Sequence, residues 1–331
     1  MADSAFGFVE RQACPGCGGA ESDLLYECHF DEGAVGNVIR EHYGIDPAIL
    51  GDGTYALVRC RSCSMAYQRW VGNEPLLTDL YSDWVRDHAL PDEDPVYQKN
   101  VRRPRASRDG HELMVASRYL GIPLAELVTL DFGMGWALWA RIAAQLGCKS
   151  HGSELAEERM AYARRHGVST LSLEAVGDDR FHFINTEQVF EHLTDPLAVG
   201  QALARSLRPG GILKISVPLA ADAEAIAAQL RNDNASVDGE RLMPVAPLEH
   251  INGFNYRAAG VFASKLGLEV VRPSLPTRYA FLTAPGAFSY GDPVSIAKEL
   301  IRPLWQDRNR RNLYVWLRKP ASVATGSGSR G

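Results

Sequence analysis

Residues 130–135 read LDFGMG, and this stretch does most to decide the fold. The apolar segment at 127–130 predicts a strand that enters a glycine turn, and the run at 136–146 predicts the helix that follows the turn. A second short strand is expected to end at Glu154, 19 positions after Gly135. Glycines let the backbone approach a ligand closely, and an acidic side chain at that strand end accepts hydrogen bonds from ribose hydroxyls. The pattern therefore predicts a nucleoside-binding βαβ unit.

The glycine turn departs from the dinucleotide pattern G-x-G-x-x-G. Gly133 and Gly135 are followed by Trp-Ala-Leu at 136–138, so the third glycine, which packs the helix against the strand, is missing. Asp131 would repel a phosphate but suits the cationic amino group of an amino acid. Both features favour S-adenosylmethionine over NAD. A short glycine motif leaves open an ordinary strand-turn-helix of an α/β core as the alternative.

Downstream segments extend the α/β pattern. Residues 181–185 read as a buried strand, residues 196–207 as a helix that Arg-Pro-Gly-Gly at 208–211 ends, and residues 212–218 as the next strand. Over residues 111–319 the chain resembles the class I S-adenosylmethionine-dependent methyltransferases. The segments that carry the resemblance are Asp131-Phe132-Gly133-Met134-Gly135, Glu154, Glu191-His192-Leu193, Asp195-Pro196 and Leu207-Arg208-Pro209-Gly210-Gly211.

This resemblance implies a Rossmann-like α/β fold with a seven-stranded, mostly parallel sheet. The last strand, at 313–317, is expected to be antiparallel. The domain would span residues 111–319, with insertions at 219–250 and 273–312. Ligands bind at the carboxyl ends of the strands in such sheets, so the first insertion, which follows a strand end, is expected to be a substrate lid.

The resemblance also assigns residues to S-adenosyl-L-methionine. Asp131 would contact the methionine end, directly or through water, and the turn at 133–135 would face the cofactor. Glu154 would bind the ribose hydroxyls, and Gln188 would line the methionine side. The complete set expected around the cofactor is Asp131, Phe132, Gly133, Gly135, Glu154, Leu155 and Gln188.

Four of the six cysteines fall in two C-x-x-C pairs near the N-terminus, namely Cys14, Cys17, Cys60 and Cys63. This is metal-ligand spacing, and four thiolates make a closed tetrahedral zinc site with no open position for catalysis. Disulfides are disfavoured because no export signal is visible, and a thioredoxin-type motif because no βαβ unit surrounds either pair. We therefore expect a structural zinc ion that holds together a lobe at residues 8–72. Cys28 and Cys148 are expected to be incidental thiols, and His29 is a weaker candidate ligand.

Residues 74–81 resemble the segment after the second cysteine pair in a subgroup of bacterial methyltransferases with an N-terminal zinc-binding lobe. That subgroup includes C-methyltransferases acting on nucleotide-linked deoxysugars. The resemblance implies that the lobe packs beside the catalytic domain and helps form the substrate cleft, with residues 73–110 as a linker or helical lid. The sugar enzymes carry a further large C-terminal domain, whereas this chain ends soon after residue 319. A nucleotide-linked sugar is thus one candidate acceptor beside related biosynthetic intermediates.

Proton removal from the acceptor requires a base in addition to the already activated cofactor. Two Glu-His pairs are candidates: Glu191-His192 after the fourth strand, and Glu249-His250 after the first insertion. Histidine titrates nearest to neutral pH, so His192 and His250 are equal candidates for the base. Tyr81 is a further candidate at the cleft. The alternative role of each is structural: a helix-capping carboxylate, a hydrogen-bonded histidine or a packing tyrosine.

The composition matches a globular enzyme. The chain has 331 residues, 46% of them hydrophobic, and a net charge of -5, which disfavours a broad nucleic-acid-binding surface. No apolar run is long enough to cross a membrane and the N-terminus lacks signal-peptide features, so we expect a cytoplasmic protein. The Gly/Ser-rich residues at 320–331 are expected to form a disordered tail.

The sequence thus predicts a methyltransferase that modifies a small molecule. One alternative is methylation of RNA or protein with the zinc lobe as the recognition module, although Asp31, Glu32 and Glu41 dilute positive charge there. Another is a cofactor-binding, non-catalytic scaffold, against which the complete set of Asp131, both glycines and Glu154 argues. The acceptor atom (carbon, oxygen or nitrogen) and the oligomeric state remain open.

Overall fold

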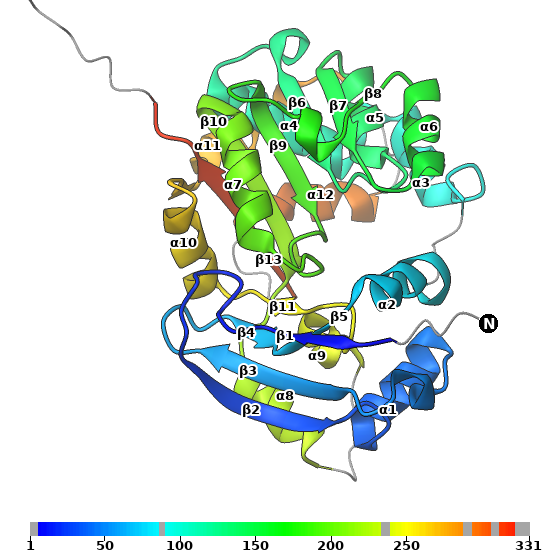
Figure 1. Ribbon diagram of the computed structural model, residues 1–331. Coiled ribbons are helices and arrows are strands. Elements are labelled where there is room, and N and C mark those ends of the chain that lie inside the picture. The colour runs from blue at the N-terminus through cyan, green and yellow to red at the C-terminus, as the bar shows by residue number, and fades with distance from the viewer. Residues whose placement is uncertain (1–5, 86–89, 233–238, 287–292, 306–310, 322–331) are drawn as a thin grey trace, which may run out of the picture.

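The structure is a computed structural model that describes residues 6–85, 90–232, 239–286, 293–305 and 311–321. A seven-stranded sheet forms the larger of its two parts, in the upper half of Figure 1, with the strand order β12-β13-β10-β9-β6-β7-β8. The strands are β6 (Val128–Phe132), β7 (Lys149–Ser153), β8 (Ser169–Thr170), β9 (Phe181–Glu187), β10 (Leu207–Pro218), β12 (Glu269–Val271) and β13 (Asn312–Arg318). Only β13 runs antiparallel to its neighbours, β10 and β12. This confirms the predicted fold class.

Helices cover the two faces of this sheet (Figure 1). They are α4 (Arg108–Leu120), α5 (Leu138–Gln145), α6 (Glu157–Arg165), α7 (Pro196–Ser206), α10 (Tyr256–Lys265), α11 (Leu275–Arg278) and α12 (Pro293–Trp305). The side chain of Asp195 caps α7 by accepting a hydrogen bond from the Ala198 amide, and Pro196 provides the first helical position. Helix α5 begins two residues later than predicted because Ala137 has a positive φ of 59°.

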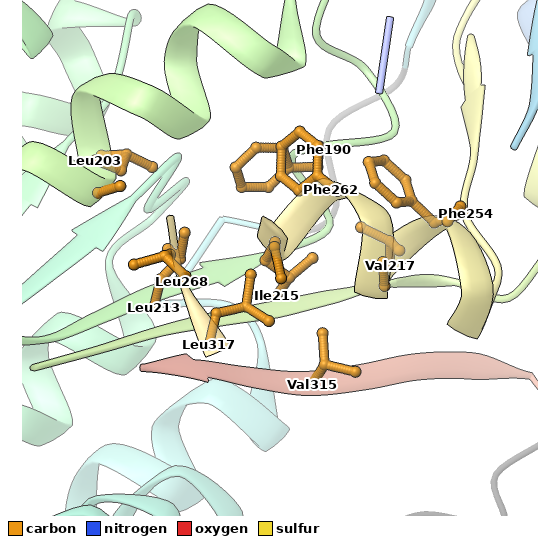
Figure 2. Packing of buried hydrophobic residues seen from close by; sticks show 14 of the residues in the cluster. Phe190, Leu203, Leu213, Ile215, Val217, Phe254, Phe262, Leu268, Val315 and Leu317 are labelled. Carbon is orange, nitrogen blue, oxygen red and sulfur yellow. The ribbon is translucent and has the colours of Figure 1, made fainter. Parts of the chain in front are cut away.

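An aromatic cluster holds the loop after β9 against the sheet. Figure 2 shows Phe190, Phe254 and Phe262 together beside Ile215 and Val217 of β10. The ring centroids of Phe190 and Phe262 lie 5.5 Å apart, and those of Phe254 and Phe262 lie 5.6 Å apart, all edge to face. The cluster therefore fixes the chain directly before Glu191 and directly after the segment that contains His250.

The smaller part, at the bottom of Figure 1, is built on a four-stranded sheet of order β11-β4-β3-β2. Its strands are β2 (Ser22–His29), β3 (Thr54–Cys60), β4 (Ala66–Gln68) and β11 (Asn252–Gly253), with β1 (Phe8–Glu10) and β5 (Trp70–Gly72) paired beside it. Its helices are α1 (Gly33–Val38), Ile39–Tyr43 and Pro47–Leu50. Strand β11 comes from far along the chain, so the N-terminal lobe is completed by a segment that follows the first insertion.

The first insertion packs into the core of the N-terminal lobe. It contains α8 (Ala223–Leu230), α9 (Gly239–Leu242) and the short helix Met243–Val245. The insertion residues that share a buried apolar cluster with the lobe are Ala223, Ala227, Leu230, Leu242, Val245 and Leu248. The predicted lid is thus packed against the lobe over these residues.

Short helices connect the lobe to the large sheet. They are α2 (Glu74–Asp79), Leu80–Trp84, α3 (Pro95–Arg102) and Pro104–Ala106. Three further short helices lie within the larger part: Leu124–Glu126, Leu173–Ala175 and Ala280–Thr283. Residues 322–331, most of the tail predicted to be disordered, lie outside the described residues. None of the helices within the described ranges has the length and apolar character that a membrane span requires.

Acid should weaken the fold through Glu187 at the end of β9. Burial disfavours its ionised form, but buried Lys214 (Nζ to Oε2, 2.5 Å) and Arg108 outweigh burial and lower the pKa of the carboxyl from 4.5 to about 2. A lowered pKa contributes stability that is complete above pH 4.5 and lost as the pH falls toward 2. We expect urea unfolding to show a steeper loss of stability over this window in the wild type than in Glu187→Gln. The exposed Glu157→Gln should follow the wild-type pH dependence, and equal slopes for all three proteins would refute the role of Glu187.

Candidate cofactor and acceptor site

The glycine turn lies at the carboxyl end of the central strands. Gly133 has a φ of 69°, and a Cβ there would come within 2.6 Å of the Val189 side chain, so both conformation and space require glycine. Gly135 has a φ of 51°, and a Cβ on it would meet nothing within 4 Å. Its amide donates a 2.9 Å hydrogen bond to Oε2 of Glu154, and the Leu155 amide donates a 2.8 Å bond to Oε1. The turn thus faces open space beside an oriented carboxylate, which fits a nucleoside ribose.

Asp131 is buried beneath this turn. Asn185 Nδ2 donates a 2.7 Å hydrogen bond to its Oδ1, and the Ala140 amide donates one of 3.2 Å to its Oδ2. Burial raises the pKa of Asp131 to about 7 despite these bonds. The sequence interpretation missed Asn185 as a hydrogen-bond partner of Asp131. Asn185 ends the predicted strand at 181–185, next to the strand that carries Asp131, but only the strand register shows that the two residues are paired.

The other expected cofactor residues surround the turn. Leu155 has a fully exposed side chain, and Phe132 is half-buried against the core. Gln188 has a φ of 54°, and its amide donates to the Ser216 carbonyl. Gln188 also lines a cleft of about 700 Å³.

All five candidate catalytic side chains converge in one cluster. The rings of His192 and His250 lie 4.7 Å apart, and the Tyr81 hydroxyl lies 3.4 Å from His192 Nδ1. Nε2 of His192 lies 3.9 Å from Oε1 of Glu191, and Nε2 of His250 lies 3.9 Å from Oε1 of Glu249. The structure therefore brings Tyr81 together with His192, 111 positions later in the chain, and with the segment that carries Glu249 and His250.

Burial keeps both imidazoles neutral. It lowers the pKa of His192 to about 3, and it also lowers the pKa of His250. Nδ1 of His192 lies 3.1 Å from the Glu249 carbonyl, and Nδ1 of His250 contacts the Met243 carbonyl. Because a carbonyl only accepts, each Nδ1 carries the proton and each Nε2 carries a lone pair.

The N-terminal lobe positions the segment that carries Glu249 and His250. Tyr55 donates a 2.9 Å hydrogen bond to the Val245 carbonyl, and Gln68 donates to the carbonyls of Ala246 and His250. His42, which the sequence interpretation missed, places Nε2 3.5 Å from Glu249 Oε2. No local sequence signal distinguishes His42, since its role depends on packing between the lobe and the insertion.

A cleft of about 700 Å³ opens between the end of β10 and the insertion. It is lined by Gln188, Pro218, Asp222, Arg241, Met243 and Arg311, among others. Met243, whose carbonyl contacts Nδ1 of His250, belongs to this lining, whereas the five cluster residues do not. The space is large enough for a small-molecule acceptor.

The four paired cysteines converge at a second location. All four Sγ atoms are within 4.8 Å of one another, with Cys14 to Cys63 and Cys17 to Cys60 both at 3.6 Å. A tetrahedral zinc ion with Zn–S bonds of about 2.3 Å places its sulfurs roughly 3.8 Å apart, so the donor set fits zinc. All six cysteines are free, and Cys28 and Cys148 lie outside the group.

The sheet order, the glycine turn and the acidic residue after the second strand define a class I S-adenosylmethionine-dependent methyltransferase. A family model described as a methyltransferase domain matches residues 102–272, more than half of the chain. The chain therefore belongs to this methyltransferase-domain family.

Curated relatives match the chain over shorter segments. The ubiquinone biosynthesis O-methyltransferase of Xanthomonas oryzae pv. oryzae (strain PXO99A) is 33% identical over 108 residues, 29% of this chain and 44% of that protein. That of Dinoroseobacter shibae is 31% identical over 133 residues, 37% of this chain and 51% of that protein. The chain thus spans about half the length, or less, of these relatives. The solved 1,6-didemethyltoxoflavin-N1-methyltransferase of Burkholderia thailandensis is 17% identical with a TM-score of 0.39, covering 71% of this chain and 92% of that one.

Proposed function

We propose that this protein transfers a methyl group from S-adenosylmethionine to a small-molecule acceptor held in the cleft. The observation that carries the proposal is the convergence of two Glu-His pairs and Tyr81 in one cluster, in which His250 contacts Met243 of the cleft lining. A scaffold that only binds the cofactor has no need of such a cluster. Methylation of RNA is disfavoured by the net charge of -5.

When bound, S-adenosylmethionine supplies an electrophilic methyl group on a positively charged sulfur. Glu154 would accept hydrogen bonds from the ribose hydroxyls, and Asp131 would contact the methionine end, directly or through water; each of its oxygens already accepts one protein donor. A neutral imidazole, His192 or His250, would take the acceptor proton at Nε2 as the new bond to carbon forms. Glu191 and His250 are buried, which limits the access of water to these two groups.

An oxygen acceptor is supported by the names of the curated relatives, which are O-methyltransferases. A nucleotide-linked sugar is supported by a different feature, because Arg241 and Arg311 both line the cleft and guanidinium groups bind phosphate. Radiolabelled methyl transfer, compared between aromatic hydroxyl compounds and nucleotide-linked sugars, would separate these two acceptor classes.

We also propose that the four cysteines hold a structural zinc ion. The close Sγ distances and the burial of all four side chains support this assignment. The zinc-binding lobe would then comprise residues 8–72, joined by the insertion and β11. Residues 111–319 would form the methyltransferase domain, with residues 73–110 as the helical connection.

Cofactor binding should depend on Glu154. Loss of its carboxylate in Glu154→Ala removes the acceptor of the ribose hydroxyls and frees the turn amide of Gly135, so affinity for S-adenosylhomocysteine should fall roughly 10- to 100-fold. Calorimetric titration measures this change. The exposed Glu158→Ala, four positions away on α6, should bind as the wild type does. If a folded wild-type protein shows no affinity for S-adenosylhomocysteine or S-adenosylmethionine, the proposed function is wrong.

A further inference from the structure

Glu191 is a buried carboxylate without a partner. The residue is 1% exposed, and within the described part of the chain neither carboxylate oxygen has a hydrogen-bond partner. A buried carboxylate in that state is costly unless it is protonated or meets a cation. No lysine or arginine among the described residues forms an ion pair with it. The side chains that face Glu191 therefore decide whether it is protonated or binds a cation.

Two imidazole nitrogens face this carboxylate. His192 Nε2 lies 3.9 Å from Glu191 Oε1, and one ligand atom each from Glu191, His192 and His250 lie within 4.8 Å of one another. Both Nδ1 atoms are occupied by backbone carbonyls, which orients both Nε2 lone pairs. Histidine ligands of metals are held in this way, with the second ring nitrogen donating to a carbonyl or a carboxylate.

We propose that Glu191, His192 and His250 form a binding site for one divalent transition-metal ion of the Zn²⁺ or Fe²⁺ class. Two imidazoles and one carboxylate are a ligand set for such ions, and they leave coordination positions open. Ligand atoms around such an ion are roughly 3 Å apart, so inward shifts of about 1 Å complete the site. Mg²⁺ is disfavoured because it prefers oxygen ligands. The site is separate from the four cysteines and differs from them in donor chemistry.

The consequence for catalysis rests on the proposed function. An ion held by Glu191, His192 and His250 would supply Lewis-acid chemistry at an open position, where it would make an acceptor hydroxyl more acidic. Glu249, whose Oε1 lies 3.9 Å from His250 Nε2, would be the nearby carboxylate that receives the proton. The oxygen then bonds to the methyl carbon while the carbon–sulfur bond breaks, and that electron pair stays on sulfur. In the metal-free protein His192 or His250 would take the acceptor proton, as proposed above. With an ion bound to both Nε2 atoms, the ion would promote loss of that proton instead.

Cobalt binding tests the site without any acceptor. The full-length protein, with zinc retained on its cysteines, is dialysed against a mild chelator and titrated with Co²⁺. We expect one further equivalent per chain, with weak visible bands of nitrogen and oxygen ligation and without the intense near-ultraviolet absorption of thiolate ligation. Glu191→Gln and His250→Gln should each weaken Co²⁺ binding about 100-fold, because each removes one ligand. His42→Gln, a histidine outside the three, should keep the full equivalent.

Three outcomes would overturn the site. These are no Co²⁺ uptake beyond the cysteine group, uptake with thiolate absorption, or uptake that both ligand variants retain. The wild-type spectrum is decisive even where a variant fails to fold. Methyl transfer and S-adenosylhomocysteine binding, measured on the same samples, separate the two proposals: Co²⁺ uptake without either would leave the site standing and remove the proposed function. Methyl transfer by a wild-type protein that binds no Co²⁺ would support the proposed function and remove the metal site.

Discussion

Cys60→Ala is expected to lose the proposed zinc ion and to unfold the N-terminal lobe. Structural zinc contributes roughly 10–16 kcal/mol of apparent binding free energy in small metal-dependent domains, and that energy is folding energy. Cys60 ends β3, the strand that carries Tyr55, and Tyr55 and Gln68 hold the chain from Val245 to His250. Loss of the lobe should therefore also release His250 and abolish methyl transfer.

Metal analysis and limited proteolysis measure this effect together. The wild type should contain zinc and resist cleavage within residues 8–72, whereas Cys60→Ala should lack the cysteine-bound zinc and be cut there. Cys28→Ala is the matched control, because Cys28 is a half-buried thiol of β2 outside the group. If the Cys60→Ala protein has unchanged zinc content and protease resistance, the four cysteines do not hold a structural zinc ion.

His250→Asn and His192→Asn are each expected to lower kcat about 10²- to 10⁴-fold, the usual contribution of a positioned group that promotes proton transfer. Asparagine keeps a polar side chain that reaches a backbone carbonyl but lacks an equivalent of Nε2. S-adenosylhomocysteine affinity should stay within twofold of the wild type, since neither side chain contacts the glycine turn or Glu154. Steady-state kinetics with any identified acceptor, together with calorimetry, measures both quantities.

A remote histidine serves as the control for these kinetics. His166 follows α6, and its Nδ1 contacts the Tyr162 carbonyl, so His166→Asn removes a comparable hydrogen bond far from the cluster. It should leave kcat unchanged. Wild-type kcat in both His250→Asn and His192→Asn would show that the cluster is structural and that proton removal occurs elsewhere.

Local patterns determined the architecture of the large sheet. The predicted strands at 127–130, 181–185 and 212–218 correspond to β6, β9 and β10, and the antiparallel last strand is confirmed as β13. Apolar runs bounded by glycine and proline indicate buried strands because each run is a property of neighbouring residues. The start of α5 was placed too early because the positive φ of Ala137 has no signature in residue type.

The sequence by itself determined the fold class, the family, and two sets of side chains whose spacing is short: the cysteine pairs and the glycine turn with Glu154. The tertiary structure alone decided that β11 and the first insertion complete the N-terminal lobe. It also decided that Tyr81, His192 and His250 meet, and that Glu191 is buried near His192 with no hydrogen-bond partner in the part of the chain that the structure describes. The physical reason is that contacts between distant residues depend on strand register and on how the lobe packs against the sheet, which no short window of residues encodes.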